Sequence, residues 1–309
     1  MDCNPLEASV AQVATFLTLL FSEGRQVSTI RNYRSAIGSV HRGFADGSSL
    51  SNNELISQLL RGMFNRRPPE KRLTPSWSIN DVLQTLARPP YEPLHNATLE
   101  HLTHKTVFLV AAASARRRSE LQALTTRDGF IRFEQGGVRL LTDPQFLAKN
   151  QSSSFTPGDI FLPELKEFSS VAEDKLWCPV RALKWYLERT KVVRTSDKLF
   201  VIPRSPYSAA AKDTISKWLI RLISPHASQG ENVRAHDIRG HATSKAWFAR
   251  VPLEDIMKAA AWKTPSTFVS SYLIGSRSAE SAFASSVLRA PVLHRPAPPS
   301  TLRGHISYI

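Results

Sequence analysis

The chain has 309 residues with 42% hydrophobic content, which is enough for two soluble domains with real cores. Its 40 Lys and Arg against 26 Asp and Glu leave a net charge of +14, which favours a polyanionic partner, most simply nucleic acid. Two distant cysteines, Cys3 and Cys178, exclude a disulfide framework and a cysteine-based zinc site, and they indicate a reducing compartment.

Residues 1–65 are predicted to form a small helical domain. The first helix has apolar residues at helical spacing from Val10 to Phe21, and a turn follows at Gly24. A third helix is expected over residues 53–64. The second helix is predicted from one apolar stripe, formed by Ile30, Tyr33, Ile37, Val40 and Phe44.

Residues 66–75 are predicted to be a basic linker, because the paired Pro68 and Pro69 cannot continue a helix. Such a segment could run along a phosphate backbone, and a solvated linker without a ligand explains it equally well. The candidate DNA-binding residues lie in this linker and its approach, and on the second helix beside its apolar stripe. These are Arg31, Arg34, Arg66, Arg67, Lys71 and Arg72.

Residues 76–288 are predicted to form a second, mostly helical domain with a small antiparallel β-sheet. Three short β-type segments, at 129–133, 138–141 and 159–162, are separated by Gly, Asn and Ser. Helices are expected at 79–86, 99–113, 179–188, 212–222, 241–249 and 253–260, and Pro179 is placed like a first-turn proline. Residues 289–309 contain four prolines and are predicted to be a flexible tail.

The most informative segment contains His236, Arg239, Trp262 and Tyr272 within 37 residues. Upstream, residues 116–118 supply three consecutive arginines. A phosphodiester resists attack because its anionic oxygens repel a nucleophile and its alkoxide leaves poorly. Arginines can hold the phosphate charge, an acid can protonate the leaving oxygen, and a covalent intermediate keeps the bond energy for rejoining. The segment therefore predicts covalent attack on DNA by Tyr272.

The same residues resemble the boxes of the tyrosine recombinases, the phage-integrase family. Arg117-Arg118-Ser119-Glu120-Leu121 is similar to the family's first box, and His236 with Arg239 is similar to its second. Ala261-Trp262, with Tyr272 ten residues on, resembles its third box and nucleophile. The amino-acid sequence of residues 262–273 looks most like that of the recombinases of eukaryotic mobile elements, including DIRS-like retrotransposons. Residues 27–37 also resemble the family's N-terminal core-binding domain, so the likeness covers roughly residues 6–285.

The resemblance implies a role for each matching residue. Arg117 and Arg239 would bind the scissile phosphate, His236 would transfer a proton to or from the tyrosine, and Trp262 would donate its indole N–H to a phosphate oxygen. Tyr272 would attack phosphorus, giving a 3′-phosphotyrosyl link and a free 5′-hydroxyl.

Two supporting roles come from the same resemblance. Glu120, about one helical turn after Arg117, would orient the site from behind. The family also uses a lysine on a β-hairpin as general acid, and Lys149, between β-type segments, is the candidate here.

Three departures from the family pattern stand out. The family often has His after the second-box arginine, whereas Gly240 stands here and His241 follows. The family usually has Gly before the third-box residue, and Ala261 takes that place. The consecutive arginines leave the register open, so Arg116 or Arg118 could face the phosphate in place of Arg117.

The family implies double-stranded DNA as substrate and self-assembly into dimers and tetramers, with no cofactor and no metal. His101 and His104 have metal-pair spacing but no third ligand nearby, so a solvated helix face is expected there. Long apolar runs and a leader are missing, so neither membrane insertion nor secretion is expected. The favoured compartment is the nucleus of a eukaryote; in a bacterium it would be the cytoplasm and nucleoid.

Two alternatives remain beside the site-specific recombinase or integrase. One is a catalytically retired recombinase that acts as a DNA-binding protein. The other is a strand relaxer like the type IB topoisomerases, which uses the same chemistry on a single duplex.

Overall fold

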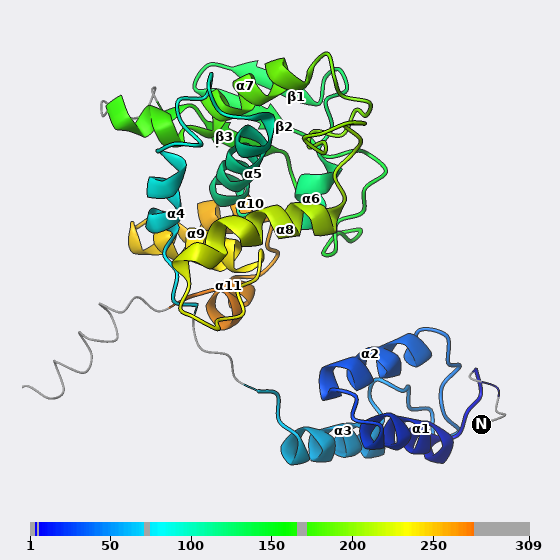
Figure 1. The fold of residues 1–309 in the computed structure, drawn as a ribbon. Coiled ribbons are helices and arrows are strands. Elements are labelled where there is room, and N and C mark those ends of the chain that lie inside the picture. The colour runs from blue at the N-terminus through cyan, green and yellow to red at the C-terminus, as the bar shows by residue number, and fades with distance from the viewer. Residues whose placement is uncertain (1–3, 5, 71–74, 166–171, 275–309) are drawn as a thin grey trace, which may run out of the picture. The chain divides into compact units, whose positions relative to one another are not determined.

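The structure is a computed structural model that describes residues 4, 6–70, 75–165 and 172–274. The chain divides into two compact units, residues 1–73 and 74–309 (Figure 1). The predicted tail at 289–309 lies outside the described residues, as do Lys71 and Arg72 of the predicted linker.

The smaller unit contains three helices, α1 (Val10–Ser22), α2 (Val27–Gly38) and α3 (Glu54–Arg66). Ser9 caps α1 through a capping box with Gln12, and the Asn53 side chain caps α3. The three helices share one apolar core, which includes Leu17, Ile30 and Ile56, each fully buried. This core explains why the helical spacing in the sequence located the helices.

The predicted stripe of the second helix is wrong beyond Ile37. Helix α2 ends at Gly38, and Val40 is 54% exposed. The chain turns away because the backbone N–H of Arg42 bonds the carbonyl of Leu6, and because Gly43 takes a φ of +100° that L side chains rarely adopt. Contacts with the segment before α1 therefore end a helix that the apolar pattern would have continued.

The larger unit begins with α4 (Ile79–Leu86), α5 (Leu99–Ser114) and α6 (Arg118–Ala123). An antiparallel sheet follows, with β1 (Ile131–Glu134), β2 (Gly137–Leu140) and β3 (Ile160–Pro163) in the order β1-β2-β3. Phe133 pairs with Val138, and Val138 pairs with Leu162. The predicted fold class, mainly helical with a small antiparallel sheet, is confirmed.

The second half of this unit is helical. It contains the 3₁₀ helix η2 (Ala172–Trp177), α7 (Pro179–Thr190), α8 (Lys212–Ile223), the short η3 (Ser224–His226), α9 (Asp237–Phe248), α10 (Leu253–Ala260) and α11 (Pro265–Ser271). Pro179 stands in the first turn of α7, as predicted. Two expectations fail: α9 begins four residues before the predicted 241, and α11 was not predicted.

Helix α5 is the central element of the larger unit, in contact with α7, α8, α9 and β3 (Figure 1). It is buried on nearly every side, so even His104 and Lys105 are buried. The expected solvated face at His101 and His104 is therefore wrong for His104, which packs against Trp218 with ring centroids 5.6 Å apart. The C-terminal ends of α5 and α10 frame the candidate site.

Candidate active site

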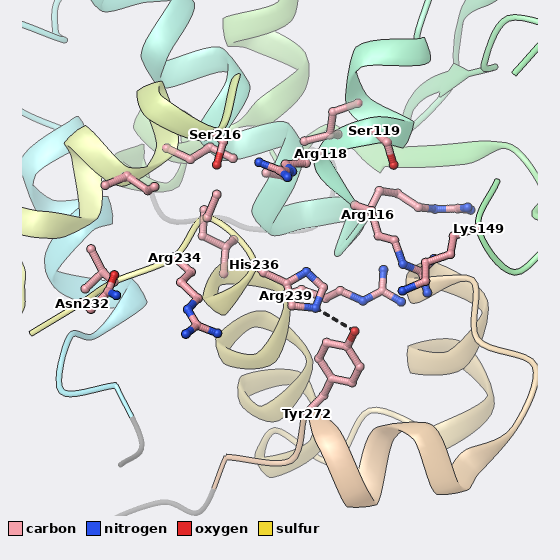
Figure 2. Close-up of a pocket in the computed structure, with 18 of the residues that line it drawn as sticks. Arg116, Arg118, Ser119, Lys149, Ser216, Asn232, Arg234, His236, Arg239 and Tyr272 are labelled. Carbon is pink, nitrogen blue, oxygen red and sulfur yellow. Dashed lines mark hydrogen bonds between the residues drawn. The ribbon is translucent and has the colours of Figure 1, made fainter. Parts of the chain in front are cut away.

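The side chains of His236 and Tyr272 meet in one pocket of the larger unit (Figure 2). His236 is the N-cap residue of α9, and Tyr272 directly follows the last residue of α11. His236 Nε2 and Tyr272 Oη lie 2.8 Å apart, within hydrogen-bond distance. The pocket has a volume of about 720 Å³ and both side chains line it. At this distance the imidazole can exchange a proton with the phenol.

Arg239 lies one helical turn after His236 and is only 2% exposed. Its Nη1 donates to the carbonyl oxygen of Ala115 at 2.6 Å, and its Nη2 donates to that of Ala260 at 2.5 Å. These two carbonyls belong to the C-terminal ends of α5 and α10. Arg239 therefore binds together the two helix ends from which Arg117 and Trp262 follow.

Arg239 also carries a charge that is only partly compensated. Burial, followed by the positive charge of Arg117, lowers the pKa of Arg239 to about 10, so the guanidinium stays charged at neutral pH. Its Nε is buried and has no hydrogen-bond partner among the described residues. Buried donors are rarely left unsatisfied, and this one stands in a site rich in cations. An anionic oxygen is the natural acceptor for it.

The three consecutive arginines have different surroundings. Arg116 is buried and donates to Glu120 and to two carbonyl groups between β2 and β3. Arg118 is half exposed and pairs with an exposed aspartate of α8 at 2.9 Å. Arg117 is 18% exposed at its side chain, and its Nη1 contacts Asn150 and Glu120. All three line the pocket, and Arg117 is the one that is neither enclosed by backbone carbonyls nor paired at the surface.

Glu120 lies behind the arginines and is 2% exposed. One carboxylate oxygen accepts from Arg116, and the other accepts from the backbone N–H of Arg117 at 2.9 Å, which forms the N-terminal cap of α6. The carboxylate therefore fixes the backbone from which the Arg117 side chain enters the pocket.

Lys149 lies on a turn in the connection between β2 and β3 and lines the same pocket. Figure 2 shows its side chain extending toward Arg239 and Tyr272. The next residue, Asn150, was missed in the sequence. Its Nδ2 donates to the carbonyl oxygen of Ala261 at 2.6 Å, and its Oδ1 accepts from Arg117 at 3.2 Å. No pattern in the sequence marked it, because both partners are distant along the chain.

Trp262 lies behind the pocket and does not line it. Its ring is 4% exposed and packs against Tyr272 with centroids 4.6 Å apart and against Phe268 at 5.6 Å. The guanidinium carbon of Arg239 lies 4.6 Å from the same ring. Within the part of the chain that the structure describes, the indole N–H is buried without a hydrogen-bond partner. The described geometry shows Trp262 packed against Tyr272, and a bond from its N–H to phosphate stays a prediction.

The departure at Gly240 has a steric cause. A Cβ there would lie 3.0 Å from the side chain of Ile274 and 3.4 Å from the carbonyl oxygen of Tyr272. Ser244, one turn later, donates to that same carbonyl at 3.0 Å and accepts from the N–H of Ile274 at 2.8 Å. Gly240 and Ser244 together let the segment after α11 pack directly on α9.

His241 faces away from this segment. It stacks on Trp77 with ring centroids 4.0 Å apart, and burial lowers the pKa of His241 to about 4. It therefore does not take the place of the family's second-box histidine in the pocket.

Burial and the surrounding cations favour the neutral form of the His236 imidazole. Burial lowers the pKa of His236, and the cations Arg239, Arg117 and Lys149 lower it further, while Asp237 opposes them. A neutral imidazole can accept a proton from Tyr272. The pocket thus combines a proton acceptor, a phenol and a set of fixed cations.

The candidate DNA-binding residues of the smaller unit differ in what they contact. Arg31 and Arg66 are exposed, and the Arg31 guanidinium lies 5.5 Å from the ring centroid of Phe64. Arg34 is half-buried, with Nη1 3.5 Å from the carbonyl of Ser51. Arg67 instead packs on Phe21, with 3.9 Å to the ring centroid, and donates to two carbonyls near the end of α1. Arg67 therefore stabilises the unit itself.

Within the described ranges, no cluster of three or more His, Cys, Asp or Glu side chains is placed to hold a metal ion. In the same ranges, no helix combines the length and the apolar character needed to cross a membrane.

No protein-family model matches this sequence, and no curated protein matches it. Solved structures do match. The Tn1549 transposon integrase in complex with transposon right-end DNA is 12% identical, with a TM-score of 0.57 over 93% of this chain and 88% of that one. The XerH site-specific recombinase bound to palindromic difH substrate, in a post-cleavage complex, is 15% identical, with a TM-score of 0.53 over 90% of this chain and 72% of that one. The chain therefore has the fold of the tyrosine recombinases.

Proposed function

We propose that the chain is a site-specific DNA recombinase or integrase that cleaves and rejoins duplex DNA through Tyr272. The observation that carries this proposal is the contact between Tyr272 Oη and His236 Nε2 in a pocket that also holds Arg117, Arg239 and Lys149. The structures that share the fold support the same class of function, because the Tn1549 protein is an integrase and XerH is a site-specific recombinase. Fold alone does not establish function, so the pocket is the stronger argument.

The proposed step is a direct displacement at phosphorus. Tyr272 Oη forms the new bond to phosphorus while its proton passes to His236, and the bond from phosphorus to the 5′-oxygen breaks. The electron pair goes to that oxygen, which takes a proton from Lys149. Arg117 and Arg239 hold the charge on the non-bridging oxygens. The reverse attack by a 5′-hydroxyl rejoins the strand without an external energy source.

Incubation with nicked duplexes drawn from the DNA flanking the chain's gene tests this function. We expect a protein–DNA adduct that survives denaturant, with the modified peptide containing Tyr272. Salt-sensitive DNA binding without any adduct would instead support a retired recombinase. Relaxation of a supercoiled plasmid, without exchange between two duplexes, would support the topoisomerase-like alternative.

Three further elements of the proposal concern context. The phosphotyrosyl link would be at the 3′ end, as the family resemblance implies. The chain would act as a dimer or tetramer on DNA, as the family resemblance implies. The amino-acid sequence of residues 262–273 supports an origin in a eukaryotic mobile element, and hence the nucleus as the compartment. Purification of adducts from crosslinked nuclei would test that compartment.

The rate of adduct formation is expected to fall at acid pH with a midpoint below 6.5. Burial and the neighbouring arginines lower the pKa of His236, so the imidazole stays neutral below its ordinary value and loses its proton-accepting role only under more acidic conditions. The second-order rate at sub-saturating DNA measures this midpoint. His236→Gln should remove the acid limb and slow the reaction by roughly 10²–10⁴-fold. A midpoint above 6.5, or an unchanged limb in the variant, would contradict the role of His236.

DNA affinity is expected to fall steeply with salt, with a slope that depends on Arg31. Each phosphate contact contributes about 0.9 to the slope of log K against log salt, so Arg31→Ala should reduce it by about that amount. Arg67→Ala should leave the slope nearly unchanged and lower the thermal stability of the smaller unit, because Arg67 bonds backbone carbonyls there. Titrations at several salt concentrations decide this. Equal slopes for Arg31→Ala and wild type would show that Arg31 does not contact phosphate.

A further inference from the structure

We infer that Asn150 is a positioning residue that holds Lys149 in place to protonate the leaving oxygen. This inference rests on the proposed function and deepens it. Lys149 lies on an exposed turn of the long connection 141–159, so its placement depends on what anchors that connection. Asn150 is the next residue, and it bonds both Arg117, which lines the pocket, and the backbone of Ala261, which precedes Trp262 behind the pocket.

Both ends of the Asn150 amide are used. Nδ2 donates to the carbonyl oxygen of Ala261 at 2.6 Å, and Oδ1 accepts from Arg117 Nη1 at 3.2 Å. Rotating the amide by half a turn would point its N–H groups at a guanidinium and its oxygen at a carbonyl. Both contacts would then become repulsive. The pair of partners therefore sets a single orientation of the side chain.

Ala261 is itself a fixed point. It ends α10 in the left-handed conformation, with φ +48°, and the backbone N–H of Trp262 bonds back to the carbonyl of Met257 at 2.9 Å. A non-glycine residue in this conformation is unfavourable by itself, so its surroundings keep it there. Its carbonyl is turned out of the helix end toward Asn150. The lysine-bearing connection is thereby joined to the segment that leads to the nucleophile.

A second, more exposed contact joins the same two segments. Lys263 Nζ donates to Ser154 Oγ at 2.9 Å. Ser154 lies four residues after Asn150 and contacts neither Arg117 nor the pocket. Ser154→Ala is therefore a matched control, since it loosens the same connection without touching the bond beside Lys149.

The test compares two leaving groups in the nicked duplex that gives the Tyr272 adduct. One duplex has the natural 5′-bridging oxygen at the cleaved position, and the other has sulfur there. A thiol has a pKa near 8.5, so a thiolate leaves without a proton, whereas an alkoxide needs one. We expect Asn150→Ala to slow cleavage of the oxygen duplex by about tenfold or more, and of the sulfur duplex by less than about threefold. Ser154→Ala should cleave both at nearly the wild-type rate.

A double variant gives an independent readout. If Asn150 acts through Lys149, the Lys149→Ala/Asn150→Ala protein should cleave the oxygen duplex no more slowly than Lys149→Ala alone. Asn150→Asp, which keeps an acceptor for Arg117 but loses the bond to Ala261, guards against misfolding of the alanine variant and should show the same leaving-group dependence.

The outcomes separate the two proposals. If wild type forms no Tyr272 adduct with either duplex, the proposed function falls and this inference falls with it. If adducts form but Asn150→Ala slows both duplexes equally, or its effect multiplies with that of Lys149→Ala, only the positioning role of Asn150 is overturned.

Discussion

Tyr272→Phe is expected to abolish the covalent adduct and to leave DNA binding intact. The substitution removes one oxygen and keeps the aromatic ring. The centroid of that ring lies 4.6 Å from the centroid of the Trp262 ring and 5.2 Å from the guanidinium carbon of Arg239. Without Oη there is no nucleophile at this position, and loss of a nucleophile typically costs on the order of 10⁴-fold or more in rate. Denaturing gels of single-turnover reactions would measure the loss.

Binding and stability serve as internal checks on this result. DNA affinity should stay within about twofold, and the free energy of unfolding within about 1 kcal/mol, since the hydrogen bond to His236 is the one that Tyr272 Oη makes with the described residues. Tyr207→Phe, in the same unit but outside the pocket, is the matched control and should form adduct normally. An adduct that persists in Tyr272→Phe would mean that another side chain attacks. Loss of binding as well would mean that Tyr272 is structural.

Amphipathic periodicity predicted most of the helices, because their positions follow from which face is buried. The predicted spans 79–86 and 253–260 match α4 and α10 residue for residue. The failures occur where tertiary contacts override the pattern. Helix α9 was placed too late because its first turn is built from residues that serve the pocket, so it lacks an apolar stripe. Helix α11 is only seven residues long, and the proline at its first position was the single usable signal.

The candidate site was predictable only in part, for a similar reason. Motif spacing located four side chains that the fold brings into one pocket: Arg117, His236, Arg239 and Tyr272. Lys149, which lines the same pocket, was chosen from its place between β-type segments and not from a motif. Motif spacing could not show that Trp262 packs behind these side chains, because the direction and burial of its indole ring depend on the turn between α10 and α11. Asn150 and Ser244 carried no recognisable spacing, since each acts through backbone groups distant in sequence. Contacts between a side chain and backbone groups far along the chain leave no spacing pattern in the sequence.

Removing the two candidate phosphate-binding arginines is expected to separate catalysis from stability. Arg117→Ala should slow adduct formation by roughly 10²–10³-fold, as loss of a charge-stabilising donor does, and should change the free energy of unfolding by less than about 1 kcal/mol. Arg239→Ala should abolish adduct formation and also destabilise the larger unit by about 3–5 kcal/mol. The difference arises because Arg239 is buried and donates to the carbonyls of Ala115 and Ala260, which would be left without partners.

Tryptophan fluorescence during chemical denaturation can report the larger unit alone, since all six tryptophans lie after residue 74. If Arg239→Ala does not fold, Arg239→Lys can replace it in the test. The lysine keeps the charge and can reach only one of the two carbonyls, so this variant should unfold at a lower denaturant concentration than wild type and still cleave far more slowly. Equal stability of the Arg117 and Arg239 variants would contradict the dual role of Arg239. If Arg117→Ala cleaves normally and Arg116→Ala or Arg118→Ala does not, the phosphate is bound by Arg116 or Arg118 and not by Arg117. Because Arg239 joins the ends of α5 and α10, the same guanidinium that would bind the phosphate also holds the other groups of the pocket together.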